Sequence, residues 1–114
     1  MRDISTFNKI YLASAPVDFR KQAHGLSVIV ENTFKKPATN EKYLFAFTNK
    51  RKNAVKLLYW DSTGYALWWK VLEKDRFHWP RNDEDVSLLH PRDLKWLLEG
   101  IDLSTINKHR KIIL

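Results

Sequence analysis

The chain has 114 residues, 44% of them hydrophobic, with a formal net charge of +7 and no cysteine. This length suits one compact domain with a single core, and the absence of cysteine excludes disulfides and thiolate metal sites. No apolar run approaches the ~20 residues that span a bilayer, and nothing near Met1 resembles a signal peptide, so we expect a soluble, cytoplasmic protein.

The excess of positive charge lies entirely in the first half of the sequence. Residues 1–57 hold 11 Lys and Arg against 4 Asp and Glu, whereas residues 58–114 hold 9 of each. Such asymmetry favours an anionic partner, with nucleic acid first and an acidic protein surface second.

The first third of the chain predicts a strand and a helix. Residues 1–8 are polar and suggest a frayed start, and the run KIYLA at 9–13 predicts a short strand that ends before Pro16. Asp18 suits a helix N-cap, and apolar residues recurring every three or four positions predict a helix over 18–35. These apolar positions are Phe19, Ala23, Leu26, Val30 and Phe34.

Residues 43–48 (YLFAFT) predict a second strand, and the polar residues 49–53 a hairpin tip. If Asn49 faces Asn53, the aromatic side chains of 43–47 share a sheet face with Tyr59 and Trp68. We expect the 18–35 helix to cover that face.

Residues 54–72 predict the hairpin on which the sheet is centred. Two apolar runs flank the turn sequence DSTG at 61–64, and placing Trp60 opposite Tyr65 puts Lys56 and Trp69 on their face of the sheet. Both faces are largely apolar. We therefore expect the hairpin in the middle of a sheet covered on both sides, or covered by this chain on one side and by a partner on the other.

Residues 76–79 predict a short fourth strand, 86–89 a brief extended piece, and 91–101 a helix that begins at Pro91 and packs on an edge or on the other face of the sheet. The sequence thus predicts an α+β fold: a single domain over 1–114 in which an antiparallel β-sheet (meander) packs with two main helices. Its core spans about 9–103, and a basic tail covers 104–114.

The sequence lacks the usual catalytic motifs. It has no glycine-rich phosphate loop, no HExxH and no G-x-S-x-G, and its four histidines lack ligand spacing, so we expect no catalytic residue, metal or cofactor. Four carboxylates offer the alternative of a two-metal site for phosphoryl chemistry, but turn and cap positions already account for them. They are Asp18, Asp61, Glu73 and Asp75.

Two groups of residues are candidates for binding. Cations at the predicted tip suit phosphate contacts, although a solvated tip is the alternative. They are Lys50, Arg51 and Lys52, with Lys56 further along the strand and Arg20 and Lys21 near the first helix. Three aromatic residues on the Lys56 face could stack unpaired bases, dock a partner or simply form core. They are Trp60, Tyr65 and Trp69.

Several blocks of the sequence resemble a known family. They are IYLAxxPVDFRK at 10–21, LFAFTNKR at 44–51, VKLLYWDSTGYALWWKVLEKDRFHWP at 55–80 and LLEGID at 97–102. This order is similar to TnpB, the small accessory protein of insertion-sequence-sixty-six-type transposable elements and the product of their second reading frame. The resemblance implies a bacterial transposition accessory factor encoded beside a separate, larger transposase that carries the catalytic acids.

We therefore predict a non-catalytic accessory protein in transposition that binds DNA at the element ends through the six cations named above. The alternative is an adaptor that docks on the element's transposase through Trp60, Tyr65 and Trp69. Neither reading involves a membrane or a small-molecule substrate.

Overall fold

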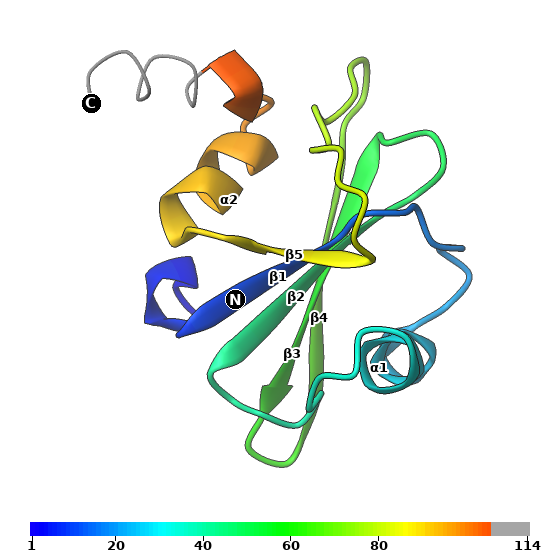
Figure 1. The fold of residues 1–114 in the computed structure, drawn as a ribbon, viewed down its shortest axis with the longest axis vertical. Coiled ribbons are helices and arrows are strands. Elements are labelled where there is room, and N and C mark those ends of the chain that lie inside the picture. Colours follow the sequence, from blue (N-terminus) through cyan, green and yellow to red (C-terminus); the bar gives the residue numbers. More distant parts are fainter. Residues whose placement is uncertain (106–114) are drawn as a thin grey trace.

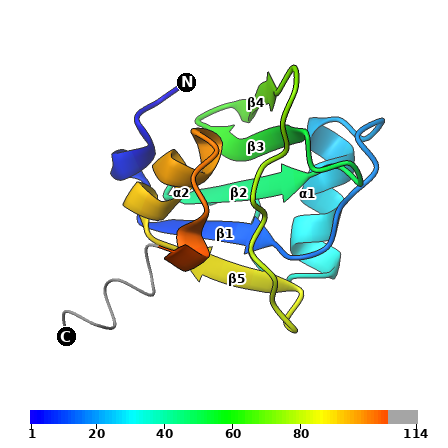
Figure 2. The ribbon, with the colours of Figure 1, turned by 90° about the horizontal axis from the view of Figure 1, so that it is seen from above.

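The computed structural model describes residues 1–105: a five-stranded sheet lies between helices on both of its faces (Figure 1). Viewed from above, α1 lies on one side of the sheet and α2 on the other (Figure 2). The strands are ordered β4-β3-β2-β1-β5. In chain order the elements are the 3-10 helix η1 (Ile4–Thr6), β1 (Lys9–Ala13), α1 (Ala23–Asn32), β2 (Tyr43–Thr48), β3 (Ala54–Asp61), β4 (Gly64–Val71), β5 (Val86–Leu89) and α2 (Pro91–Leu98).

The α+β class is confirmed, but the sheet is mixed. β2, β3 and β4 form the predicted antiparallel meander, and β5 pairs antiparallel with β1. β1 runs parallel to β2, with Ile10 beside Leu44. The chain leaves the end of β1, crosses one face of the sheet as α1 and returns to the start of β2, and a crossover of this kind makes the two strands parallel.

The central hairpin has the predicted register, with Trp60 opposite Tyr65 and Lys56 opposite Trp69. Its position in the sheet differs from the prediction, because only one of its two strands, β3, lies in the interior of the sheet. β4 pairs with β3 alone and forms an edge of the sheet. This explains why β3 is buried almost throughout, whereas Trp69 and Val71 on β4 are 56% and 52% exposed.

The predicted pairing of Asn49 with Asn53 is wrong by one residue. In the structure Thr48 pairs with Val55 and Phe47 with Lys56. Side chains alternate along a strand, so a shift of one residue moves a whole set to the opposite face. The aromatic residues of β2 therefore share a face with Lys56 rather than with Tyr59 and Trp68.

α1 covers that aromatic face, as expected for the first helix. Leu26 and Val30 are fully buried against Phe45, Phe47 and Leu58. The helix is shorter than the predicted 18–35, because it starts at Ala23 and ends at Asn32.

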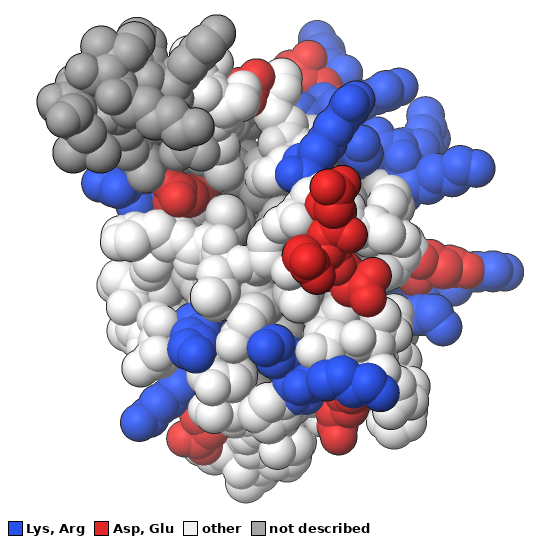
Figure 3. All heavy atoms as spheres, viewed as in Figure 1, with Lys and Arg blue, Asp and Glu red and all other residues white. Residues whose placement is uncertain are grey.

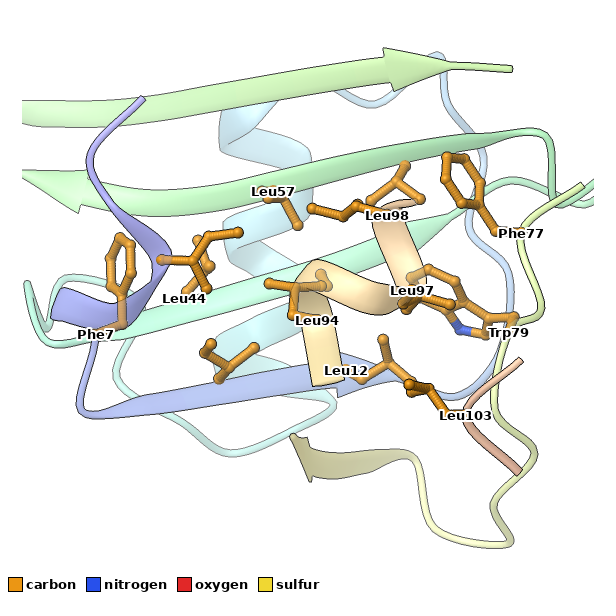
Figure 4. Packing of buried hydrophobic residues seen from close by; sticks show 14 of the residues in the cluster. Phe7, Leu12, Leu44, Leu57, Phe77, Trp79, Leu94, Leu97, Leu98 and Leu103 are labelled. Carbon is orange, nitrogen blue, oxygen red and sulfur yellow. The ribbon is translucent and has the colours of Figure 1, made fainter. Parts of the chain in front are cut away.

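The opposite face is covered by α2 and η1. Figure 4 shows Leu94, Leu97 and Leu98 of α2 lying over the strand residues Leu12 and Leu57. This confirms that the helix starting at Pro91 packs on the other face of the sheet, although it ends at Leu98 rather than at 101.

Two predictions at the margins of this core are wrong. Residues 1–8 are not frayed, because η1 buries Ile4 and Phe7 beside the sheet. Residues 76–79 form no strand, yet Phe77 and Trp79 are buried, and the Trp79 indole N–H donates to the Ala13 carbonyl at 2.8 Å. Apolar side chains thus anchor both segments without a β-ladder. Most of the predicted basic tail, residues 106–114, lies outside the described residues.

Candidate nucleic-acid interface

The β2–β3 loop is closed by the side chain of Asn49. Its amide oxygen accepts hydrogen bonds from the backbone N–H groups of Asn53 (3.1 Å) and Ala54 (3.2 Å), and its amide nitrogen donates to Asn53 Oδ1 (2.7 Å). Lys52 adopts a left-handed backbone conformation with φ of 58°, and its N–H donates to the Asn49 carbonyl. This network fixes the backbone of residues 49–54. It accounts for a loop that is one residue longer than the predicted pairing of Asn49 with Asn53 would give.

Three consecutive cations project from this tip. Lys50 and Arg51 are exposed and Lys52 is half-buried. The ion pairs found in the described part of the chain involve none of them. Their charges are therefore available to an anionic partner, and each phosphate that such cations neutralise releases counterions.

The segment after β1 lies beside this tip. The Val17 N–H donates to the carbonyl of Thr48, the last residue of β2, at 2.9 Å. Residues 16–19 and 49–51 together line an open groove of about 640 Å³. The two segments meet because the carboxyl ends of parallel neighbouring strands lie at the same edge of a sheet.

Arg20 is exposed but paired with a carboxylate. Asp18 Oδ2 lies 2.6 Å from the Arg20 guanidinium, and Asp18 Oδ1 accepts a hydrogen bond from the Arg20 backbone N–H at 2.9 Å. Bonding to the Arg20 side chain, and then to its backbone, lowers the pKa of Asp18 to about 2. Asp18 therefore closes a local turn instead of capping α1, which explains why the helix starts later than predicted.

Lys56 does not extend the basic tip as the sequence suggested. Its side chain is fully buried, and its ammonium donates to the carbonyls of Phe19 and Lys21 at 2.9 Å each. The same ammonium lies 4.8 Å from the Phe19 ring centroid and 4.7 Å from that of Trp69. Burial lowers the pKa of Lys56. Lys56 thus holds the 19–21 segment against the sheet, and Lys21 itself is exposed beside it.

Two further cations lie at this end of the molecule and were missed from the sequence. The Leu72 N–H donates to the Asn53 carbonyl at 2.8 Å, and the Phe77 N–H to the Lys52 carbonyl at 2.7 Å. The intervening residues line a small groove of about 200 Å³ with Arg51, and they include the exposed Lys74 and Arg76. Their alternation with Glu73 and Asp75 gives a locally neutral sequence, so the charge pattern did not point to this position.

The cations at the tip and beside it, from 20–21, 50–52 and 74–76, form the basic end of the molecule. This end holds only part of the chain's charge. Figure 3 shows Lys and Arg side chains gathered over the β2–β3 loop and the chain after β4, with an acidic group beside them over the segment that leads into β5. Other cations of the first half lie elsewhere, such as Arg2 over the Phe7 ring and Lys36 over the Tyr11 ring. The excess charge is therefore only partly concentrated at the tip.

The three aromatic candidates follow the edge of the sheet. Trp60 and Tyr65 pack edge to face with ring centroids 5.0 Å apart, and both are half-buried. Trp69 is the most exposed of the three and packs edge to face with Phe19. The structure thus leaves part of this face open at β4, on the side of the sheet that carries α1.

In the described residues, the four carboxylates considered for metal chemistry are not arranged as a set of metal ligands. Within residues 1–105, no group of three or more His, Asp or Glu side chains is arranged to hold a metal ion. Among the same residues, no helix is long and apolar enough to cross a membrane.

Comparison with known proteins identifies the family. The model of the family described as IS66 Orf2 like protein matches residues 8–108. The chain belongs to this family. Two relatives of this chain come from Sinorhizobium fredii (strain NBRC 101917 / NGR234). Uncharacterized protein y4jC is 29% identical over 101 residues, covering 88% of this chain and 85% of the relative. Uncharacterized protein y4hO is 28% identical over 94 residues, covering 82% and 81%. No solved structure gives a significant match.

Membership of the IS66 Orf2-like family confirms the resemblance to TnpB and implies an accessory role in transposition. In this family member, residues 16–19 from the first of the sequence blocks and residues 49–51 from the second line one groove.

Proposed function

We propose that this IS66 Orf2-like protein is a non-catalytic transposition factor that binds DNA at the element ends through the basic end of its sheet. The contacts come from the tip cations Lys50, Arg51 and Lys52, flanked by Arg20 and Lys21. Lys74 and Arg76 extend the surface on the other side of the tip. Lys56 is not a contact, because it is buried and bound to backbone carbonyls.

One observation carries the proposal: the tip holds three consecutive cations that form no ion pair with a carboxylate of the described residues. The hydrogen bonds of Asn49 fix the backbone beneath them. A fixed array of cations loses little conformational freedom on meeting a phosphate backbone, which favours binding.

The test is binding to labelled element-end DNA, measured by fluorescence anisotropy over a salt series. We expect binding at low salt that weakens steeply as salt rises. The triple variant Lys50→Ala, Arg51→Ala and Lys52→Ala should bind at least about tenfold more weakly, because it loses up to three phosphate contacts.

A matched control removes three cations from the opposite end of the sheet: Lys9→Ala, Lys35→Ala and Lys42→Ala. Both triple variants lose the same charge, and each contains one left-handed position, Lys52 or Lys35, so the two are also matched in backbone conformation. The proposal requires that only the tip variant lose DNA. An absence of binding by the wild type at low salt, or equal losses in the two variants, would overturn it.

The second candidate is an adaptor that docks on the element's transposase. It rests on the open part of the β4 face, where Trp69 and Val71 are more than half exposed. Exposed apolar residues at the edge of a sheet favour pairing with another chain.

The adaptor reading is tested by co-expressing the chain with its transposase and purifying the complex after nuclease treatment. Docking predicts that the transposase is retained and that Trp69→Ser releases it, whereas the tip triple variant keeps it. Loss of the transposase on nuclease treatment alone contradicts docking and leaves DNA as the link.

A further inference from the structure

The groove between the 16–19 segment and the tip has two chemically different ends. Pro16, Val17 and Phe19 provide an apolar wall, and Lys50 and Arg51 provide cations at its rim. An apolar wall beside two neighbouring cations suits an unpaired nucleotide. Its base is flat and apolar on both faces, and its phosphate is anionic. A paired base in a duplex cannot offer its face to such a wall.

Charge fixes the orientation of a nucleotide in this groove. Asp18 lies at the 16–19 side, and its bonds to Arg20 hold its pKa at about 2, so it is anionic at neutral pH. Its oxygens already accept from the Arg20 backbone and guanidinium. The carboxylate can only accept hydrogen bonds and is already paired with Arg20, so the cations Lys50 and Arg51 at the other end, unpaired among the described residues, are the place for the phosphate.

The apolar wall is held in place before any ligand arrives. Val17 is bonded through its backbone to Thr48, and the Phe19 carbonyl accepts from the buried Lys56 ammonium. The Phe19 ring is further fixed edge to face against Trp69. A wall that needs no ordering on binding improves affinity, because less conformational entropy is lost.

We propose that this groove binds one unpaired nucleotide, with its base against Pro16, Val17 and Phe19 and its phosphate at Lys50 and Arg51. The inference rests on the proposed DNA-binding function and narrows its substrate class. The protein then prefers single-stranded or frayed DNA over a blunt duplex.

The test compares two fluorescein-labelled probes with the full chain: a single strand of about 12 nucleotides and the blunt duplex of the same sequence. Phe19→Leu removes the ring but keeps apolar bulk, and Val17→Thr keeps the side-chain shape while adding a hydroxyl. Val28→Thr is the matched control, because Val28 is 43% exposed on α1 and does not line the groove. Thermal unfolding of each variant checks that the fold is retained.

We expect the wild type to bind the single strand at least about fivefold more tightly than the duplex, the lower end of what one stacked base contributes. Phe19→Leu should remove most of this preference and Val17→Thr part of it, both through weaker single-strand binding, while Val28→Thr leaves it unchanged. Lys50→Ala with Arg51→Ala should lower the affinity of the protein for both probes.

Equal affinity of the wild type for the two probes overturns the nucleotide groove. The nucleotide groove is also overturned if folded Phe19→Leu or Val17→Thr loses affinity for the single strand and for the duplex equally. In either case a retained dependence on Lys50 and Arg51 leaves the DNA-binding function standing, whereas failure of both probes to bind at low salt removes that function itself.

Discussion

Lys56 contributes to the basic end without facing solvent. Its ammonium bonds the carbonyls of Phe19 and Lys21 and lies between two aromatic rings. We expect Lys56→Met, which keeps the length but not the donor, to lower the free energy of unfolding by about 1–3 kcal/mol, because two carbonyls lose their partner. Urea unfolding measures the change.

Lys70→Met is the control for this substitution. Lys70 is half-buried and donates to a single carbonyl, that of Leu98, at 2.9 Å. Its loss should therefore be smaller than that of Lys56→Met. A Lys56→Met variant as stable as the wild type would show that water or repacking satisfies the two carbonyls, and that Lys56 does not fix the 19–21 segment.

Asp18 gives the pH dependence at this end of the molecule. Its pKa falls from 3.8 to about 2 on folding, so the stabilisation from the ionised carboxylate is complete above pH 3.8 and is lost as pH falls through about 2. We expect the wild type to melt at a higher temperature than Asp18→Asn near neutral pH, with the gap closing at low pH. Thermal unfolding followed by circular dichroism measures this gap.

Asp83→Asn removes the same charge from an exposed position outside the ion pairs of the described residues. It should leave the melting temperature close to that of the wild type near neutral pH. A gap between the wild type and Asp18→Asn that is constant with pH would mean that the Arg20 pair does not stabilise the fold.

At the scale of elements, the β2–β3 loop depends on Asn49. We expect Asn49→Ala to cost about 1–3 kcal/mol of folding free energy and to weaken DNA binding, because three hydrogen bonds that fix the tip are lost. Asn53→Ala loses only the side-chain bond among these three and should cost less. The two variants are compared by urea unfolding and by anisotropy, and equal effects would contradict the dominant role of Asn49.

The same loop shows where sequence reasoning stopped. Apolar runs rich in strand-forming residues predicted β2, β3 and β4, and the turn sequence at 61–64 gave the β3–β4 register correctly. The 49–53 sequence contains no turn dipeptide that sets a length. The left-handed Lys52 and the hydrogen bonds of Asn49 set the loop length instead. The resulting register places the aromatic residues of β2 on the face opposite to the predicted one.

The site was harder to predict than the strands because it depends on strand direction. The sequence identified Arg20, Lys21 and the tip cations as candidates, but an antiparallel meander gave no reason for them to be neighbours. The parallel pairing of β1 with β2 supplies that reason. Parallel pairing is a property of the crossover, and no local pattern in 9–13 or 43–48 distinguishes it from antiparallel pairing.

At the scale of the whole molecule, three connections meet at one end of the sheet. They follow β1, β2 and β4, and backbone bonds from Val17, Leu72 and Phe77 join them around the tip. Nearest the tip, residues 18–21, 50–52 and 73–76 carry seven cations against three carboxylates, and the rest of the connection after β4 adds Arg81 and the carboxylates Asp83, Glu84 and Asp85. The seven cations are Arg20, Lys21, Lys50, Arg51, Lys52, Lys74 and Arg76, and the three carboxylates are Asp18, Glu73 and Asp75.

Two of these cations come from the half of the sequence that has no net charge, so folding and not sequence position decides which charges act together. This leads to a prediction for Lys74 and Arg76. Their removal as Lys74→Ala with Arg76→Ala should reduce the slope of log affinity against log salt by up to about 1.8 for duplex DNA or 1.4 for a single strand, at 0.9 or 0.7 per phosphate contact.

The comparison pair, Lys9→Ala with Lys42→Ala, removes the same charge from the first half of the chain. Both residues lie where β1 and β2 begin, at the end of the sheet away from the tip. The slope for this double variant should equal that of the wild type, because counterions are released only where cations meet phosphates. Equal reductions of the slope in the two double variants would mean that net charge governs binding, and a wild-type slope in both would mean that Lys74 and Arg76 make no phosphate contact. A smaller slope for the Lys74 and Arg76 variant alone requires that the converging connections, taken together, form the surface that meets DNA.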